Sequence, residues 1–128
     1  MKKLVLILLF SSSFLLFSQE EKDTSIVDYP DKEASFPGGL AKMMKYFSEN
    51  LEYPKMEFET IPNGRIIIEF VINKDGSIEQ VKARKEGIKE LDEEYIRVIK
   101  NMPNWIPAEV NGEKVRSKGV LPIRIHFQ

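Results

Sequence analysis

The 128-residue sequence contains no cysteine and only one histidine, His126. Without cysteine the chain can form neither a disulfide nor a thiolate nucleophile, and a single histidine cannot build a multi-histidine metal site. The glycine-rich phosphate loop and the GxSxG nucleophile motif are also missing from the sequence. We therefore expect a protein that is not an enzyme and that uses no catalytic residue, cofactor or metal ion.

The chain also lacks an excess of either charge, because 19 lysine and arginine residues stand against 20 aspartate and glutamate residues. Nucleic-acid-binding domains carry a clustered positive footprint, so no nucleic-acid partner is expected. Three carboxylates stand in a row at Asp92, Glu93 and Glu94. Neighbouring positions on a helix point in different directions, so these groups cannot converge on one substrate bond. The run instead predicts the first turn of a helix, where the partial positive charge stabilises carboxylates.

One apolar run lies at the N-terminus between Leu4 and Phe17, with serines in its middle. Two lysines precede it and the small residue Ser18 follows it. As a helix this stretch would span roughly 21 Å, whereas the hydrocarbon core of a bilayer is about 30 Å thick. Residues 1–18 are therefore predicted to be a removable signal peptide. An uncleaved membrane anchor is the alternative.

Two parts follow this segment. Residues 19–35 are polar and acidic, which predicts a short tether with a strand-like patch at Ser25–Tyr29. Residues 36–128 are long enough for one domain. A domain of this size buries roughly 60–65% of its extended-chain surface, so it can fold without a disulfide or a metal.

Two stretches repeat apolar residues at the spacing of an amphipathic helix. The first stretch contains Leu40, Met43, Met44, Phe47 and Leu51. The second contains Leu91, Tyr95, Val98, Ile99 and Met102. We interpret the paired methionines of the first stretch as core filler. The only tryptophan, Trp105, lies between two prolines in a short extended segment, and we expect it to pack at the rim of the core.

Alternation with a period of two predicts strands. Residues 65–72 are predicted to form a strand, and the apolar residues that share one of its faces are Ile66, Ile68, Phe70 and Ile72. A turn at Asn73–Gly76 leads to a return strand, in which Ile78 is out of phase with Val81 and so indicates a bulge or a late strand start. A final strand follows the Asn111-Gly112 turn. The sequence therefore predicts an α+β fold with two helices and a small antiparallel sheet.

The final strand contains a proline, Pro122, whose position bears on where the strand lies in the sheet. In this strand we expect Leu121, Ile123, Ile125 and Phe127 to face the core, and Val120, Pro122, Arg124 and His126 to face away. Because proline has no N–H, Pro122 is tolerated at a sheet edge and not inside a sheet. A free edge can accept a strand from a partner. Alternatively, Pro122 only blocks aggregation at that edge, and both interpretations stay open.

From about Phe36 to Phe127 the sequence contains a series of short motifs in a fixed order. This stretch resembles the C-terminal domain of TonB, the energy transducer of the Gram-negative envelope, in the form common in Bacteroidetes. The motifs that carry the resemblance are Phe36-Pro37-Gly38-Gly39, Tyr53-Pro54, Gly64-Arg65, Asp75-Gly76-Ser77, Leu91-Asp92-Glu93-Glu94, Pro103-x-Trp105-x-Pro107, Asn111-Gly112 and Leu121-Pro122-Ile123. Each dipeptide alone is weak, but the ordered series is specific.

The resemblance implies a fold of two helices packed on one face of a three-stranded antiparallel sheet. It also implies a periplasmic domain that binds the TonB box of outer-membrane TonB-dependent receptors as an added strand and so supports energy-dependent transport. The partner-binding residues would be Val120, Leu121, Pro122, Ile123, Arg124, Ile125, His126 and Phe127, together with Tyr53 and Pro54 at the matching Tyr-Pro pair.

The sequence departs from a full transducer in its N-terminal part. That part is short, looks cleavable and has no proline-rich spacer. The resemblance then implies a periplasmic box binder that reaches the inner-membrane motor only through another, anchored protein, and an inner-membrane anchor facing the periplasm is the alternative. A periplasmic adaptor or scaffold domain for another envelope partner is the second functional hypothesis. Self-association through the same edge, as a homodimer, belongs to it.

Overall fold

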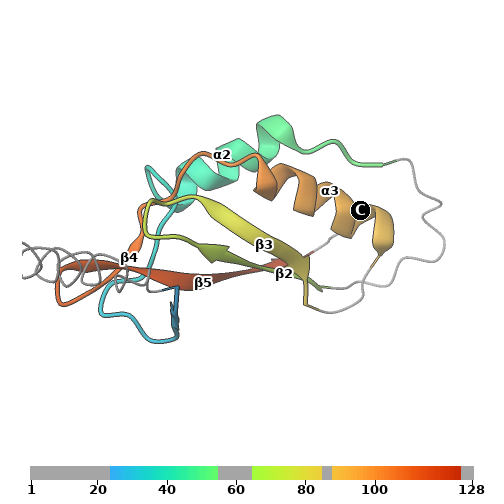
Figure 1. The fold of residues 1–128 in the computed structure, drawn as a ribbon. Coiled ribbons are helices and arrows are strands. Elements are labelled where there is room, and N and C mark those ends of the chain that lie inside the picture. Colours follow the sequence, from blue (N-terminus) through green and yellow to red (C-terminus); the bar gives the residue numbers. More distant parts are fainter. Residues whose placement is uncertain (1–23, 55–64, 85–87, 125–128) are drawn as a thin grey trace, which may run out of the picture.

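The computed structural model describes residues 24–54, 65–84 and 88–124. Two helices and five strands follow one another along these segments (Figure 1). In chain order they are β1 (Ile26–Val27), α2 (Leu40–Asn50), β2 (Arg65–Ile72), β3 (Ile78–Ala83), α3 (Lys89–Lys100), β4 (Ala108–Val110) and β5 (Glu113–Arg124). Among these described elements, no helix combines the length and the apolar character that crossing a membrane requires.

The sheet has the strand order β1-β5-β2-β3, and β4 pairs with the first part of β5. The long strands β5, β2 and β3 are mutually antiparallel, whereas β1 runs parallel to β5. The predicted α+β class is confirmed, but the expected count of three strands differs from the five observed. The two additional strands, β1 and β4, contain only two and three residues. An alternating pattern cannot be recognised over so few positions.

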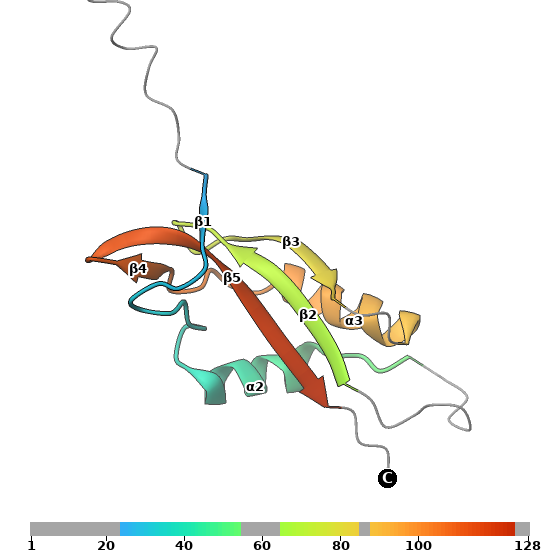
Figure 2. The ribbon, with the colours of Figure 1, turned by 90° about the horizontal axis from the view of Figure 1, so that it is seen from below.

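Both helices lie on one side of the sheet (Figures 1 and 2), and β1 forms its border beside β5. The core forms between the helices and the predicted face of β2, because Ile66, Ile68, Phe70 and Ile72 are all buried. Leu91, Tyr95, Val98 and Ile99 of α3 are buried against the same cluster. The predicted phases of β2 and of α3 are therefore confirmed.

Trp105 closes one end of this core, as expected. Its ring packs edge-on against Phe36, with ring centroids 5.9 Å apart, and against Phe70 at 5.3 Å. Its backbone N–H donates to the carbonyl of Gly76 at 2.8 Å, so the β2–β3 turn is tied to the segment that precedes β4.

The β2–β3 pair contains the irregularity that the phase of Ile78 predicts. The register shifts between Glu69 and Val71, and Gln80 adopts a positive φ of 54°. This bulge inserts one residue into β3. Ile78 and Val81, three positions apart, can therefore both pack against the core.

The described residues of the predicted tether lie against the sheet. Besides the pairing of β1 with Arg116 and Ser117, Lys32 bridges to Glu109 and Ser35 bridges to Ile106. These contacts hold residues 24–35 along β4 and the beginning of β5.

Replacing Gly76 with alanine should destabilise the protein far more than the same change at Gly112. Both glycines have positive φ values, 88° and 79°, so alanine costs about 1 kcal/mol at either position. At Gly76 the new Cβ would also meet the carbonyl oxygen of Trp105 at 2.1 Å, whereas Gly112 has open space. Denaturant unfolding should show a loss of about 3 kcal/mol for Gly76→Ala and about 1 kcal/mol for Gly112→Ala. Equal losses would contradict the packing of Trp105 over this turn.

Glu69 should make the stability depend on pH. Its carboxylate is buried and accepts hydrogen bonds from Arg84 Nε at 3.0 Å and Lys82 Nζ at 3.1 Å. These bonds hold the pKa of Glu69 below its usual range. The stabilisation is then complete above the unfolded pKa of about 4.3 and is lost as the pH falls through the folded pKa. Glu69→Gln should cost about 1 kcal/mol at neutral pH, and urea unfolding should show this difference shrinking in acid.

Candidate binding groove beside strand β5

Strand β5 has one satisfied side and one open side. Residues Ser117–Arg124 pair with β2 through their full length. On the opposite side, β1 pairs only with Arg116 and Ser117. Within the described parts of the chain, no strand pairs with the open side of Lys118–Arg124.

The hydrogen bonds of β2 show which peptide groups of β5 face the open side. The carbonyl of Ile67 accepts from the N–H of Arg84, so the peptide groups of Ile67 point toward β3. Its cross-strand partner in β5 is Pro122. This pair is therefore the non-hydrogen-bonded kind, and the backbone of Pro122 points outward. By alternation, Val120 and Arg124 also point outward, and the missing N–H of Pro122 leaves a gap in their row of donors.

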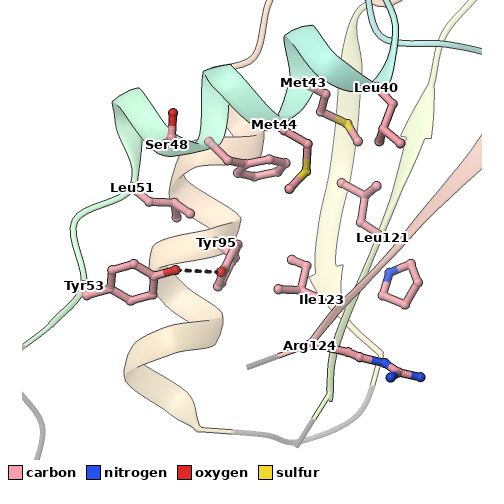
Figure 3. Close-up of a pocket in the computed structure, with 12 residues that line it drawn as sticks. Leu40, Met43, Met44, Ser48, Leu51, Tyr53, Tyr95, Leu121, Ile123 and Arg124 are labelled. Carbon is pink, nitrogen blue, oxygen red and sulfur yellow. Dashed lines mark hydrogen bonds between the residues drawn. The ribbon is translucent and has the colours of Figure 1, made fainter. Parts of the chain in front are cut away.

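A groove of about 510 Å³ runs beside this open side (Figure 3). Helix α2 and the residues after it form one wall, strand β5 forms the other, and Tyr95 of α3 closes the groove between them. The lining residues are Leu40, Met43, Met44, Phe47, Ser48, Leu51, Tyr53, Tyr95, Leu121, Pro122, Ile123 and Arg124.

The groove leaves large apolar side chains uncovered. Leu40 is 70% exposed, Met44 60% and Tyr53 65%. Figure 3 shows the side chains of Leu40 and Met44 directed toward the strand that carries Leu121. Exposed apolar residues that gather on one concave surface are typical of an interaction site. Their exposure follows from the position of α2, whose Met43 and Phe47 are buried in the core while Leu40 and Met44 border the groove.

Helix α2 is fixed to α3 by polar contacts, which set the width of the groove. The hydroxyl of Tyr46 donates to the carbonyl of Val98 at 2.7 Å. Arg97 Nη2 donates to the carbonyl of Asn50 at 3.1 Å and also to the carboxylate of Glu94. Because these bonds hold both the middle and the end of α2, the groove is formed before any partner arrives.

These contacts also correct an expectation about the acidic run. Helix α3 begins at Lys89, and the acidic residues of its first turn are Glu90 and Asp92. Glu94 therefore lies in the second turn, where it forms an ion pair with Arg97 at 2.7 Å. The prediction of three carboxylates in the first turn was wrong for Glu93 and Glu94, because the helix starts two residues earlier than its apolar stripe.

Tyr53 and Tyr95 meet at the floor of the groove, with their hydroxyl oxygens 3.5 Å apart. Tyr95 is buried, whereas Tyr53 is largely exposed. Burial, together with the hydrogen bond to Tyr53, raises the pKa of the Tyr95 phenol. The groove therefore presents a largely apolar surface with two hydroxyl groups at its closed end and the guanidinium of Arg124 as its charged group.

The predicted partner-binding residues fall into three groups. Tyr53, Leu121, Pro122, Ile123 and Arg124 line the groove. Val120 is exposed on β5, and Pro54 is half-buried beyond the lining. Ile125, His126 and Phe127 lie outside the described residues.

Sequence reasoning missed the half of the groove that α2 and α3 supply. Met43 is buried as expected, but Met44 is exposed in the groove and is not core filler. The available signal was the width of the apolar stripe. Leu40, Met44 and Leu51 lie toward one border of it, and a stripe wider than one contact face indicates a second surface to be covered.

Comparison with known proteins gives one match. The sequence model of the family described as "Gram-negative bacterial TonB protein C-terminal" matches residues 49–127. No curated protein and no solved structure matches significantly. The matched range begins within α2 and takes in both β2 and the described part of β5, so the open strand lies inside it and most of α2 lies outside it.

The buried phenol of Tyr95 should destabilise the fold in alkaline solution. Its raised pKa means that the unfolded chain, with a tyrosine pKa of about 10, loses the proton first. Stability is then complete below that pH and falls as the pH rises above it. Thermal unfolding of the Tyr95→Phe variant should fall less steeply above pH 10 than that of the unmodified protein. Identical slopes would contradict the buried environment of this hydroxyl.

Proposed function

The chain belongs to the family of Gram-negative TonB C-terminal domains, and on that basis we propose that it binds the TonB box of outer-membrane TonB-dependent receptors. The domains of this family are non-catalytic interaction domains of transport that face the periplasm. In our proposal the box enters as an additional strand beside β5. The chain would thereby support energy-dependent transport across the outer membrane.

The observation that carries the proposal is the coincidence of the open strand with the groove. Strands in a sheet lie about 4.8 Å apart, so a strand added to β5 would occupy the space between β5 and α2. Its alternate side chains would point toward the helices. There they would cover Leu40, Met44 and Tyr53, which are exposed in the free protein. Main-chain hydrogen bonds would supply affinity, and these contacts would supply the choice of peptide.

The short N-terminal part of the chain supports a further element of the proposal. Residues 24–35 of the predicted tether lie against β4 and the beginning of β5, so they do not serve as a free spacer. We propose that the chain is exported to the periplasm by a signal peptide at residues 1–18, binds receptors there, and receives force only through an anchored partner. N-terminal sequencing of the exported protein tests this, because a chain that still begins at Met1 would favour an inner-membrane anchor.

Two substitutions of β5 should change peptide affinity in opposite directions. Pro122→Ala supplies the missing outward N–H, so binding of a TonB box peptide should tighten about fivefold, as expected for one added hydrogen bond. Val120→Pro removes a second outward N–H and should weaken binding by at least the same factor. Neither change removes a bond to β2, because both peptide groups face the open side. Calorimetric titration with box peptides measures these affinities.

The matched control is Val120→Ala, which trims the exposed side chain but keeps the N–H. It should bind within about twofold of the unmodified protein, since little apolar area is lost. A backbone-resonance titration of the unmodified protein should show the largest shifts at Val120–Arg124 and along α2. Shifts that avoid β5, or equal affinity of all three variants, would rule out strand addition at this edge.

A further inference from the structure

The helix-free face of the sheet presents a second surface, which shares Pro122 and Arg124 with the lining of the groove. On β2 its residues alternate with the core residues, and on β5 they alternate with Leu121 and Ile123. We call this surface the outer face. Its described members from β2, β3 and β5 are Arg65, Ile67, Glu69, Val71, Glu79, Lys82, Arg84, Arg116, Lys118, Val120, Pro122 and Arg124.

The register of the strands arranges these residues in rows. Arg65 lies opposite Arg124, and the next row pairs Ile67 with Pro122. The rows that follow pair Glu69 with Val120, and Val71 with Lys118. Apolar side chains thus occupy the centre of the face, where Val71 is buried, while positive charges stand at Lys118 in the middle of β5 and at Arg124 at its end. Val120 is 39% exposed and Pro122 is exposed as well.

The positive charges of the outer face exceed its negative charges. The carboxylate of Glu69 is already bonded to Lys82 and Arg84, and the carboxylate of Glu79 is paired with Arg116. Arg65, Lys118 and Arg124 form no ion pair with any residue that the structure describes. The whole chain has a net charge of −1, so this concentration of cations is local.

The pairing of Arg65 with Arg124 is the least expected feature of the face. Like charges directly opposite each other on neighbouring strands destabilise a sheet. The repulsion disappears when an anion lies between or above the two guanidinium groups, which bind phosphate well. This pair therefore favours an anionic partner outside the molecule.

We propose that the outer face docks on the surface of an anionic phospholipid bilayer. The phosphates would contact Arg65, Lys118 and Arg124, while Val120 and Pro122 would reach the headgroup boundary. A sheet face that combines exposed apolar residues with neighbouring cations matches such a surface. A small cavity of about 100 Å³ lies at the end of this face, beside β1.

Docking in this way leaves the groove accessible. The groove opens between α2 and β5 on the helix side of the sheet, whereas the outer face lies on the opposite side (Figures 1 and 2). The protein could therefore rest on a membrane and bind a receptor segment at the same time. The inference does not depend on strand addition, and either proposal can fail without the other.

Vesicle binding by the full chain tests the inference. Binding to phosphatidylcholine vesicles is compared with binding to vesicles that also contain phosphatidylglycerol. The variant Arg65→Gln/Lys118→Gln/Arg124→Gln removes only cations without a described ion pair. Its affinity for the anionic vesicles should fall about 100-fold, since each cation near such a surface contributes roughly fivefold. Added salt should weaken binding of the unmodified chain.

The matched control is Lys42→Gln/Lys89→Gln/Lys100→Gln, which removes the same charge from exposed positions on the two helices. It should lose less than about fivefold, because these lysines lie on the other side of the sheet. The N-terminal apolar segment is the same in all three proteins, so the differences report the folded part. Equal losses in both variants, or no preference for anionic lipid, would overturn the proposal.

A local probe gives an independent readout. Because the sequence has no cysteine, a single polarity-sensitive dye can be placed at Val120→Cys on the outer face or at Ala41→Cys on α2. Anionic vesicles should shift the emission of the first dye to the blue and leave the second unchanged. A shift of both dyes, or of neither, would contradict docking by this face. If polyglutamate shifts the Val120 dye and anionic vesicles do not, the partner is an acidic polypeptide and the membrane proposal is wrong.

Discussion

The ladder between β2 and β5 organises the molecule. It is continuous from Ser117 to Arg124. Because side chains and peptide groups of a strand both alternate with a period of two, the ladder fixes both the face on which each side chain of β5 lies and the side to which its peptide groups point. Leu121 and Ile123 bond inward to β2 and face the helices. Val120, Pro122 and Arg124 direct their peptide groups to the open side and their side chains to the outer face. The groove, the free edge and the cationic surface are therefore consequences of one register.

The second determinant is the attachment of α2 to α3 instead of to the strands. The bonds from Tyr46 to Val98 and from Arg97 to Asn50 hold α2 beyond the edge of the paired sheet. A helix in that position would ordinarily cover a strand. Here Met43 and Phe47 reach the core, whereas Leu40 and Met44 border the groove and are exposed. Preorganisation of this kind lowers the entropic cost of binding, because neither wall has to be ordered when a peptide enters.

Much of this arrangement could be predicted from the sequence, where long periodic patterns carried the information. The faces of β2 and α3, the rim position of Trp105 and the bulge near Ile78 were all predicted correctly. What could not be predicted depends on distant pairing. Strands β1 and β4 are too short to show a period, and the start of α3 at Lys89 precedes its apolar stripe. Met43 is buried and Met44 is exposed because of where α2 lies relative to the strands, which the helical pattern alone does not show. The opposition of Arg65 and Arg124 follows from the register between β2 and β5, which no local pattern reveals.

The two borders of the sheet are not equivalent. Strand β3 ends the described strand order on the side away from β5, and its irregularity at Gln80 interrupts the straight row of backbone groups that another strand would need. Glu79 and Lys82 place charges along the same margin. A fibre grows by edge-to-edge pairing only if both edge strands of every subunit can accept another strand. A molecule whose sheet can be extended at one edge alone forms pairs or complexes of defined size. It can therefore keep the open side of β5 uncovered without forming fibres.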